Sequence, residues 1–327
     1  MKKAENKFSN FLQSRLGTAL MVLSALCAAV FGKGSADSYP AVSSGGFAFA
    51  SASGWIADAS VAFAAGLGLT ALVGLMMWAV NRTFNLLRDS STLFLGVFAV
   101  LQCSTPLVVG RLWQSIALTA VVLGVTATFY SVYMRPRQTR RIFLAFCVMS
   151  AGSLFDYVYA LYAALMLLAF HQMRCPSPRM YLAAAMGIVT PWWMAWGFGL
   201  PDHGIHLSER LSVFASLDRP QLVMTLVTVG ITVIVSILVC CTNMVKIYSY
   251  NARSRALSGL LAMLSLFTAT ATLVDIANAW AYLSTLNCLT AFQIGLFFRI
   301  TEKRRGYIYI VSLFAVCAIL YLCNIWL

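Results

Sequence analysis

Long apolar runs recur along almost the whole chain, and they constrain its fold more than any other feature. They begin at Leu16 and continue to Leu327, and several approach the roughly 20 residues that an α-helix needs to cross a membrane. Hydrophobic residues make up 61% of the 327 residues and charged residues 10%, whereas a soluble domain is about half apolar and a quarter charged. The sequence therefore predicts an all-α fold, a polytopic transmembrane helix bundle without a soluble domain.

The apolar runs divide the chain into about 11 segments of a single integral membrane domain, residues 1–327. We expect the segments at about 16–31, 56–80, 92–109, 112–134, 141–152, 154–170, 180–200, 220–242, 256–273, 276–298 and 306–326. The first segment has a second interpretation as a cleavable signal, because a basic start precedes it and the small residues Gly34-Ser35-Ala36 follow it. Lys33 is unusual so close to a cleavage site, so we favour a retained helix.

The basic residues fall in blocks between the apolar runs, and these blocks predict the orientation. With the N-terminus in the cytoplasm, 19 of the 23 Lys and Arg residues lie inside and 4 lie outside. An excess of Lys and Arg in short loops is typical of the cytoplasmic side. The sequence thus predicts a membrane protein with a cytoplasmic N-terminus and a C-terminus on the opposite side of the membrane. The net charge of +13 is then a topology signal, and we expect no nucleic-acid partner.

The same bias predicts a helical hairpin near residues 141–170. One continuous helix there would reverse every later loop and would place nine basic residues outside. We expect the turn at Gly152-Ser153, which makes the first arm only about 18 Å long at 1.5 Å per residue. This arm is shorter than the roughly 30 Å hydrocarbon core, so its turn should lie inside the membrane, covered by protein or facing a wet cavity. Residues 256–298 would span about 65 Å as one helix, so they should also turn, near Asp275.

Four acidic residues stand near the starts of helices that run inward. They are Asp58, Asp156, Asp218 and Asp275. One interpretation is helix capping, because the helix dipole stabilises a carboxylate at an N-terminus and Ser153-Leu154-Phe155-Asp156 matches a capping box. The other is an outward cavity that binds a cation or a proton, because an ionisable residue inside the membrane is a functional candidate. Asp156 and Asp275 are therefore candidate catalytic residues, and Tyr157 is a candidate substrate-binding residue.

Two histidines, His203 and His206, stand three residues apart in an outer loop. Either could serve as a general acid or base against a polar head group, so both are candidate catalytic residues. A metal site completed by Asp202 or Glu209 is the alternative, but Gly204 disfavours the helix that would bring the two rings to one face. The third interpretation is an exposed interfacial loop. The sequence predicts no metal and no cofactor.

Aromatic and acidic residues of the outer half offer a second candidate site. Trp192 and Trp196 are four residues apart and share a helix face, where they could stack on a sugar or form the aromatic belt of the interface. Asp37 lies in the first outer loop, where membrane-embedded sugar transferases with lipid-phosphate donors carry an acid. On the cytoplasmic side, Asn81-Arg82-Thr83-Phe84 combines arginine with an aromatic ring and suits an anionic lipid or a lipid-linked phosphate, although topology also explains it.

Several of these motifs together resemble an uncharacterised family of roughly 300-residue inner-membrane proteins of Bacteroidetes-type bacteria. The resemblance covers about residues 12–300, with one departure, since Asp156 stands where an aromatic or apolar residue is expected. It rests on Asn81-Arg82 with Phe84, Gln102, Pro106, the arginine block before the hairpin, Gly152-Ser153-Leu154-Phe155 and Thr190-Pro191-Trp192. The family has no assigned activity. The resemblance implies the inner (plasma) membrane of a two-membrane bacterium, with the C-terminus on the periplasmic side, and a role in the envelope.

Three hypotheses follow, and they leave open whether the protein is an enzyme. The first is envelope biogenesis on or beside lipid-linked glycans, with a lipid-linked glycan or an anionic lipid as partner besides the bilayer. The second is a cation- or proton-coupled transporter of a small solute, with its site at Asp156 or Asp275. The third is a non-catalytic membrane assembly partner.

Overall fold

A computed structural model describes residues 14–34, 58–87, 92–110, 112–135, 137–199, 219–247, 251–300 and 303–326, together with residues 11 and 56. Helix accounts for 89% of the described part, and no described residue lies in a strand. The main helices are α2 (Arg15–Phe31), α4 (Ala59–Phe84), α5 (Leu93–Cys103), α6 (Pro106–Gly110), α7 (Trp113–Val132), α8 (Thr139–Phe155), α9 (Val158–Gln172), α10 (Pro178–Gly197), α12 (Arg219–Ile247), α13 (Ala252–Val274), α14 (Ala279–Ile300) and α15 (Lys303–Trp326). The predicted all-α fold is confirmed.

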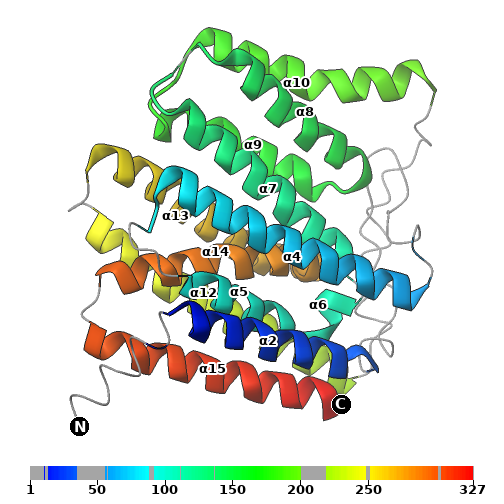
Figure 1. Ribbon diagram of the computed structural model, residues 1–327. Helices are drawn as coiled ribbons and strands as arrows, with labels where there is room; N and C mark the ends of the chain where they lie inside the picture. Colours follow the sequence, from blue (N-terminus) through cyan, green and yellow to red (C-terminus); the bar gives the residue numbers. More distant parts are fainter. Residues whose placement is uncertain are drawn as a thin grey trace.

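Six described helices are long and apolar enough to cross a membrane. They are α4, α7, α12, α13, α14 and α15. Their burial differs widely: the apolar window is 78% buried in α14 but only 22% buried in α4 and in α15. In Figure 1, α14 lies in the middle of the bundle, α15 along one edge, and α8 and α10 along the other. The helix with the most protein around it is therefore α14.

The helices run back and forth between two ends of the molecule, and charge separates the ends (Figure 1). One end, the basic end, has the first turns of α2, α8, α10 and α13. Its basic residues include Arg15, Arg82, Arg135, Arg137, Arg140, Arg141, Arg174, Arg179, Lys246, Arg253 and Arg255. The opposite end, the acidic end, has Asp58, Asp156 and Asp275, and its described basic positions are Lys33 and the start of α12 at Arg219. The blocks of basic residues in the sequence thus gather at one end of the bundle.

The hairpin near residues 141–170 is present, but its turn lies elsewhere than the sequence suggested. Helix α8 continues through Gly152 and Ser153 to Phe155, so the chain reverses at Asp156 and Tyr157. Its 17 residues span about 26 Å at 1.5 Å per residue, so the expected 18 Å arm was too short. Ser153 and Asp156 are 3% and 7% exposed, so protein covers the turn.

Helix α10 packs closely on α8, which holds the hairpin against the bundle edge. A Cβ on Gly187 would lie 2.6 Å from the carbonyl oxygen of Phe143, so only glycine permits this approach. The hydroxyl of Ser150 donates a hydrogen bond of 2.6 Å to the carbonyl of Ile188. On the inner side of α8, the rings of Phe146 and Phe170 stack at 6.1 Å and connect α8 with α9.

Candidate functional site

The first residue of the candidate site is Asp156, which lies between the end of α8 and the start of α9. Its backbone is extended, with φ of −147° and ψ of 119°, and its carboxylate Oδ1 accepts the N–H of Val158 at 3.0 Å. Asp156 is therefore an N-terminal cap of α9. The predicted capping box is wrong in its first member, since Ser153 lies inside α8 and its hydroxyl donates to the carbonyl of Ser150.

Asp275 occupies the corresponding reversal between α13 and α14. Its carboxylate accepts hydrogen bonds from the side-chain amide of Asn278 at 3.3 and 3.4 Å and from the hydroxyl of Tyr282 at 3.2 Å. It makes no side-chain cap of the short 3-10 turn Ile276–Asn278, so the predicted capping role is wrong for this residue. The described donors to Asp275 are thus an amide and a phenol, and both are neutral groups.

One side chain joins the two reversals. The amide of Asn278 also donates a hydrogen bond of 2.6 Å to the hydroxyl of Tyr157, the residue that follows Asp156. Asn278 is 4% exposed, so this link is inside the protein. We call Asp156, Tyr157, Asp275, Asn278 and Tyr282 the carboxylate cluster. Three of its members, Asp156, Asp275 and Tyr157, were predicted site residues, and the structure brings all three together.

The other predicted site residues do not join this cluster. Trp192 and Trp196 are on α10 and are 38% and 74% exposed, so the ring of Trp196 faces outward as an interfacial aromatic residue does. Asp37, His203 and His206 lie outside the described residues. Within the described part, no group of three His, Cys, Asp or Glu side chains could hold a metal ion.

A set of buried polar side chains continues from the cluster along α14, on sides of the helix that meet α5, α7 and α12. We call it the α14 seam; its members are Tyr282, Ser284, Thr285, Asn287, Thr290 and Gln293, each at most 2% exposed. Sequence reasoning missed the seam, although a signal was available. The apolar window of α14 has a mean hydropathy of 1.3, whereas those of the other five candidate spans lie between 1.8 and 2.7.

Neighbouring helices satisfy the first half of the seam. Gln102 of α5 donates to the hydroxyl of Ser284 at 3.1 Å, and its carbonyl oxygen accepts from Asn287 at 3.2 Å. The hydroxyls of Thr119 and Thr285 bond at 3.0 Å between α7 and α14. Such contacts between polar side chains hold membrane helices together.

The far end of the seam is different, because polar atoms there lack partners. The amide of Asn243 on α12 donates to the backbone carbonyl of Gln293 at 2.7 Å and to its Oε1 at 2.8 Å. Asn243 Oδ1, Gln293 Nε2 and Thr290 Oγ1 are buried without a hydrogen-bond partner among the described residues. An unsatisfied polar group is costly in a protein interior, and more so at membrane depth. At this end of the seam, one amide N–H group, one amide oxygen and one hydroxyl oxygen could therefore bind a polar species.

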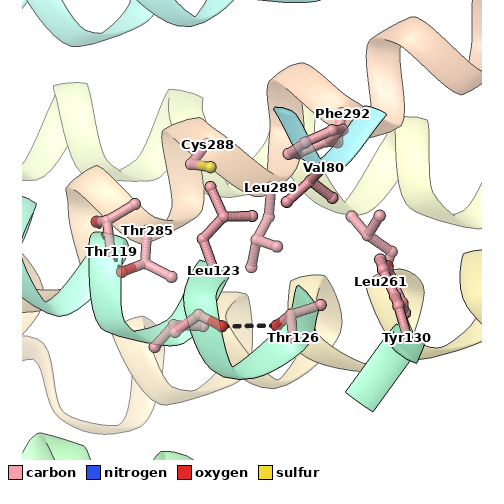
Figure 2. A pocket seen from close by; sticks show the side chains of 11 residues that line it. Val80, Thr119, Leu123, Thr126, Tyr130, Leu261, Thr285, Cys288, Leu289 and Phe292 are labelled. Atoms are coloured by element: carbon pink, nitrogen blue, oxygen red, sulfur yellow. Dashed lines mark hydrogen bonds between the residues drawn. The ribbon is translucent and has the colours of Figure 1, made fainter. Parts of the chain in front are cut away.

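Figure 2 shows a small cavity beside the seam, between α4, α7, α13 and α14. Thr119 and Thr285 lie at one side of it, and the hydroxyl of Thr126 donates to the carbonyl of Val122 at 2.7 Å, marked by the dashed line. Its volume is about 10 Å³, and most of its lining is apolar. The space suffices for about one water molecule and is too small for a substrate.

Comparison with known proteins assigns the chain to no family. No protein-family model, no curated protein and no solved structure matches the chain, so the resemblance to an envelope protein family stays a prediction.

Proposed function

We propose that the protein is an eleven-segment inner-membrane protein whose carboxylate cluster and α14 seam bind and conduct a proton or a small monovalent cation. The second sequence hypothesis, a cation- or proton-coupled transporter, is the one that this geometry supports best. The observation that carries the proposal is the combination of two carboxylates at one end of α14, buried polar side chains along the helix, and unpaired polar atoms at the far end among the described residues. Ionisable residues inside membrane proteins mark ion and proton pathways, and Asp156 and Asp275 are the ionisable members of the carboxylate cluster.

The chemistry of the seam suits this role. Tyr, Ser and Thr hydroxyls can donate and accept at once, so Tyr282 and Thr285 can relay a proton. Hydroxyl and amide oxygens can also ligate a small cation, and Asn243 Oδ1 and Thr290 Oγ1 are available for this at the far end. Asp275 supplies a negative charge at the entrance, where neutral donors hold it.

Flux measurements on the purified full-length protein in liposomes test the proposal. A pH-sensitive dye or a sodium-sensitive dye inside the vesicles should report flux under an imposed gradient. Asp275→Asn should reduce that flux at least tenfold, because the amide keeps the size of the side chain and removes the charge. Asp58→Asn is the matched control: Asp58 also lies at the acidic end, but its carboxylate caps α4 by accepting the N–H of Ser60 at 2.9 Å.

Two results would contradict the proposal. One is wild-type flux no higher than that of empty vesicles for both ions. The other is an Asp275→Asn variant that conducts at the wild-type rate.

The remaining sequence hypotheses stay predictions. For glycan chemistry, the described side chains give little support, because Trp196 is 74% exposed and no contact is described between it and the carboxylate cluster. Surface glycans of a deletion strain would test the envelope role, and an unchanged glycan pattern would argue against it.

A further inference from the structure

A long groove runs between α2 and α4. Its volume is about 1300 Å³, and α5 forms its floor, between the other two helices in Figure 1. Along α4 it extends from Leu67 to Arg82, which is about 22 Å at 1.5 Å per residue. One leaflet of the hydrocarbon core is about 15 Å thick, so the groove is longer than one leaflet is deep.

The floor keeps the two walls apart. Helix α2 packs on α5, where the hydroxyls of Thr18 and Thr92 bond at 2.8 Å and a Cβ on Gly96 would lie 2.7 Å from the sulfur of Met21. Helix α4 instead packs on α6 and α7. The walls meet at the acidic end, where Lys33 of the α2 end donates to Ser60 of α4 at 3.1 Å. A hydrogen bond therefore links the two walls at that end.

The lining changes character along its length. Leu26, Leu67 and Leu75 are among the apolar residues of the walls, and Leu75 is 65% exposed. At the basic end the lining consists instead of Arg15, Arg82, Asn81, Asn85, Thr92 and Trp78. Both arginines are exposed, and no carboxylate stands among the described residues of the lining.

We propose that this groove is a selective site for one membrane lipid with an anionic phosphate head group, its acyl chains along the walls and its phosphate between Arg15 and Arg82. A guanidinium group can donate two parallel hydrogen bonds to a phosphate. The ring of Trp78 lies under the guanidinium of Arg82 at 5.1 Å and holds it at the level of the head group. The apolar walls bind any acyl chain, and the two arginines select the head group.

The site is independent of the carboxylate cluster, which lies at the opposite end of the bundle. A failure of ion flux would leave the lipid proposal intact, and a failure of lipid selection would leave the flux proposal intact.

Native mass spectrometry of the full-length protein tests the proposal. The protein is equilibrated with mixed micelles of equal amounts of phosphatidylglycerol and phosphatidylcholine, and the lipids that stay bound are counted. The wild type should retain phosphatidylglycerol in preference. Arg15→Gln and Arg82→Gln should each lower that preference about fivefold, since a basic residue near the head groups contributes about that factor.

Two control variants separate selection from general effects. Arg179→Gln removes an arginine at the same end but on α10, far from the groove, and should leave the preference unchanged. Gly74→Leu should reduce the binding of both lipids, because a Cβ on Gly74 meets nothing within 4 Å and the new side chain fills the groove. Gly230→Leu on α12 also meets open space and should bind as the wild type does.

Three outcomes would overturn the proposal. The first is equal retention of the two lipids by the wild type. The second is an unchanged preference in the Arg15→Gln, Arg82→Gln double variant. The third is release of the bound lipid by millimolar glycerol phosphate, which would show that the arginines bind free phosphate and that the groove walls contribute nothing.

Discussion

Asp156 has two roles that one substitution can separate. Its carboxylate caps α9 through the N–H of Val158, and the following residue, Tyr157, connects it with Asn278. Asparagine caps a helix about as well as aspartate does, whereas alanine does not. Asparagine at this position therefore removes the charge alone, and alanine removes both the charge and the cap.

We expect Asp156→Ala to lower the free energy of unfolding by about 1 kcal/mol and Asp156→Asn to change it by only a few tenths. Both variants should lose ion flux, because both lack the charge. Thermal unfolding in detergent and flux in liposomes, at matched protein amounts, measure the two effects. Full flux in Asp156→Asn would leave Asp156 with capping alone.

Gln102 is the polar residue that connects α5 with the α14 seam. Replacing it with leucine leaves Ser284 and Asn287 without these partners in a buried site. We expect a loss of about 1–2 kcal/mol in unfolding free energy, since hydrogen bonds between membrane helices are of this size or slightly smaller. Thr270→Val on the exposed side of α13 is the control and should unfold as the wild type does. Equal stability of the two variants would mean that Gln102 contributes no net stabilisation.

At the scale of elements, the contact between α8 and α10 depends on Gly187. A Cβ there meets the backbone of Phe143 and the side chain of Phe146, and backbone cannot move aside cheaply. Overpacking of this kind typically costs about 1–3 kcal/mol. Gly187→Val should therefore lower the unfolding temperature clearly, while Gly230→Val on α12, where the Cβ has open space, should not. The measurement is the thermal unfolding temperature of the two variants, and equal temperatures would contradict the prediction.

The sequence predicts helices better than it predicts where they turn. Apolar runs and basic blocks indicated the α8–α9 hairpin, because these signals depend on chain-wide hydropathy and charge. They did not place its turn, because Gly152 and Ser153 look like a turn but are tolerated inside a buried helix. The sequence also predicted Asp156, Tyr157 and Asp275 as site residues. It did not predict the α14 seam, because single Ser, Thr, Asn and Gln residues within an apolar run do not reveal which side of a helix is buried.

At the scale of the whole molecule, the two charged ends predict the orientation in the membrane. Positive residues favour the cytoplasmic side, so the basic end should lie there. Reporter fusions at Arg174 and Arg253 should both read cytoplasmic, because both residues lie at the basic end. A periplasmic signal at either position would refute the eleven-segment arrangement.

The central place of α14 has a consequence for biosynthesis. Its hydrogen-bond partner Gln102 precedes Ser284 by 182 residues, which corresponds to roughly ten to forty seconds of translation at about 5–20 residues per second. During that interval the early helices are already in the bilayer with polar side chains that await α14. A ribosome-bound chain that stops before Ala279 should therefore be recognised by membrane proteases or chaperones. Once α14 has left the ribosome and inserted, the nascent protein should become resistant to these proteases and chaperones.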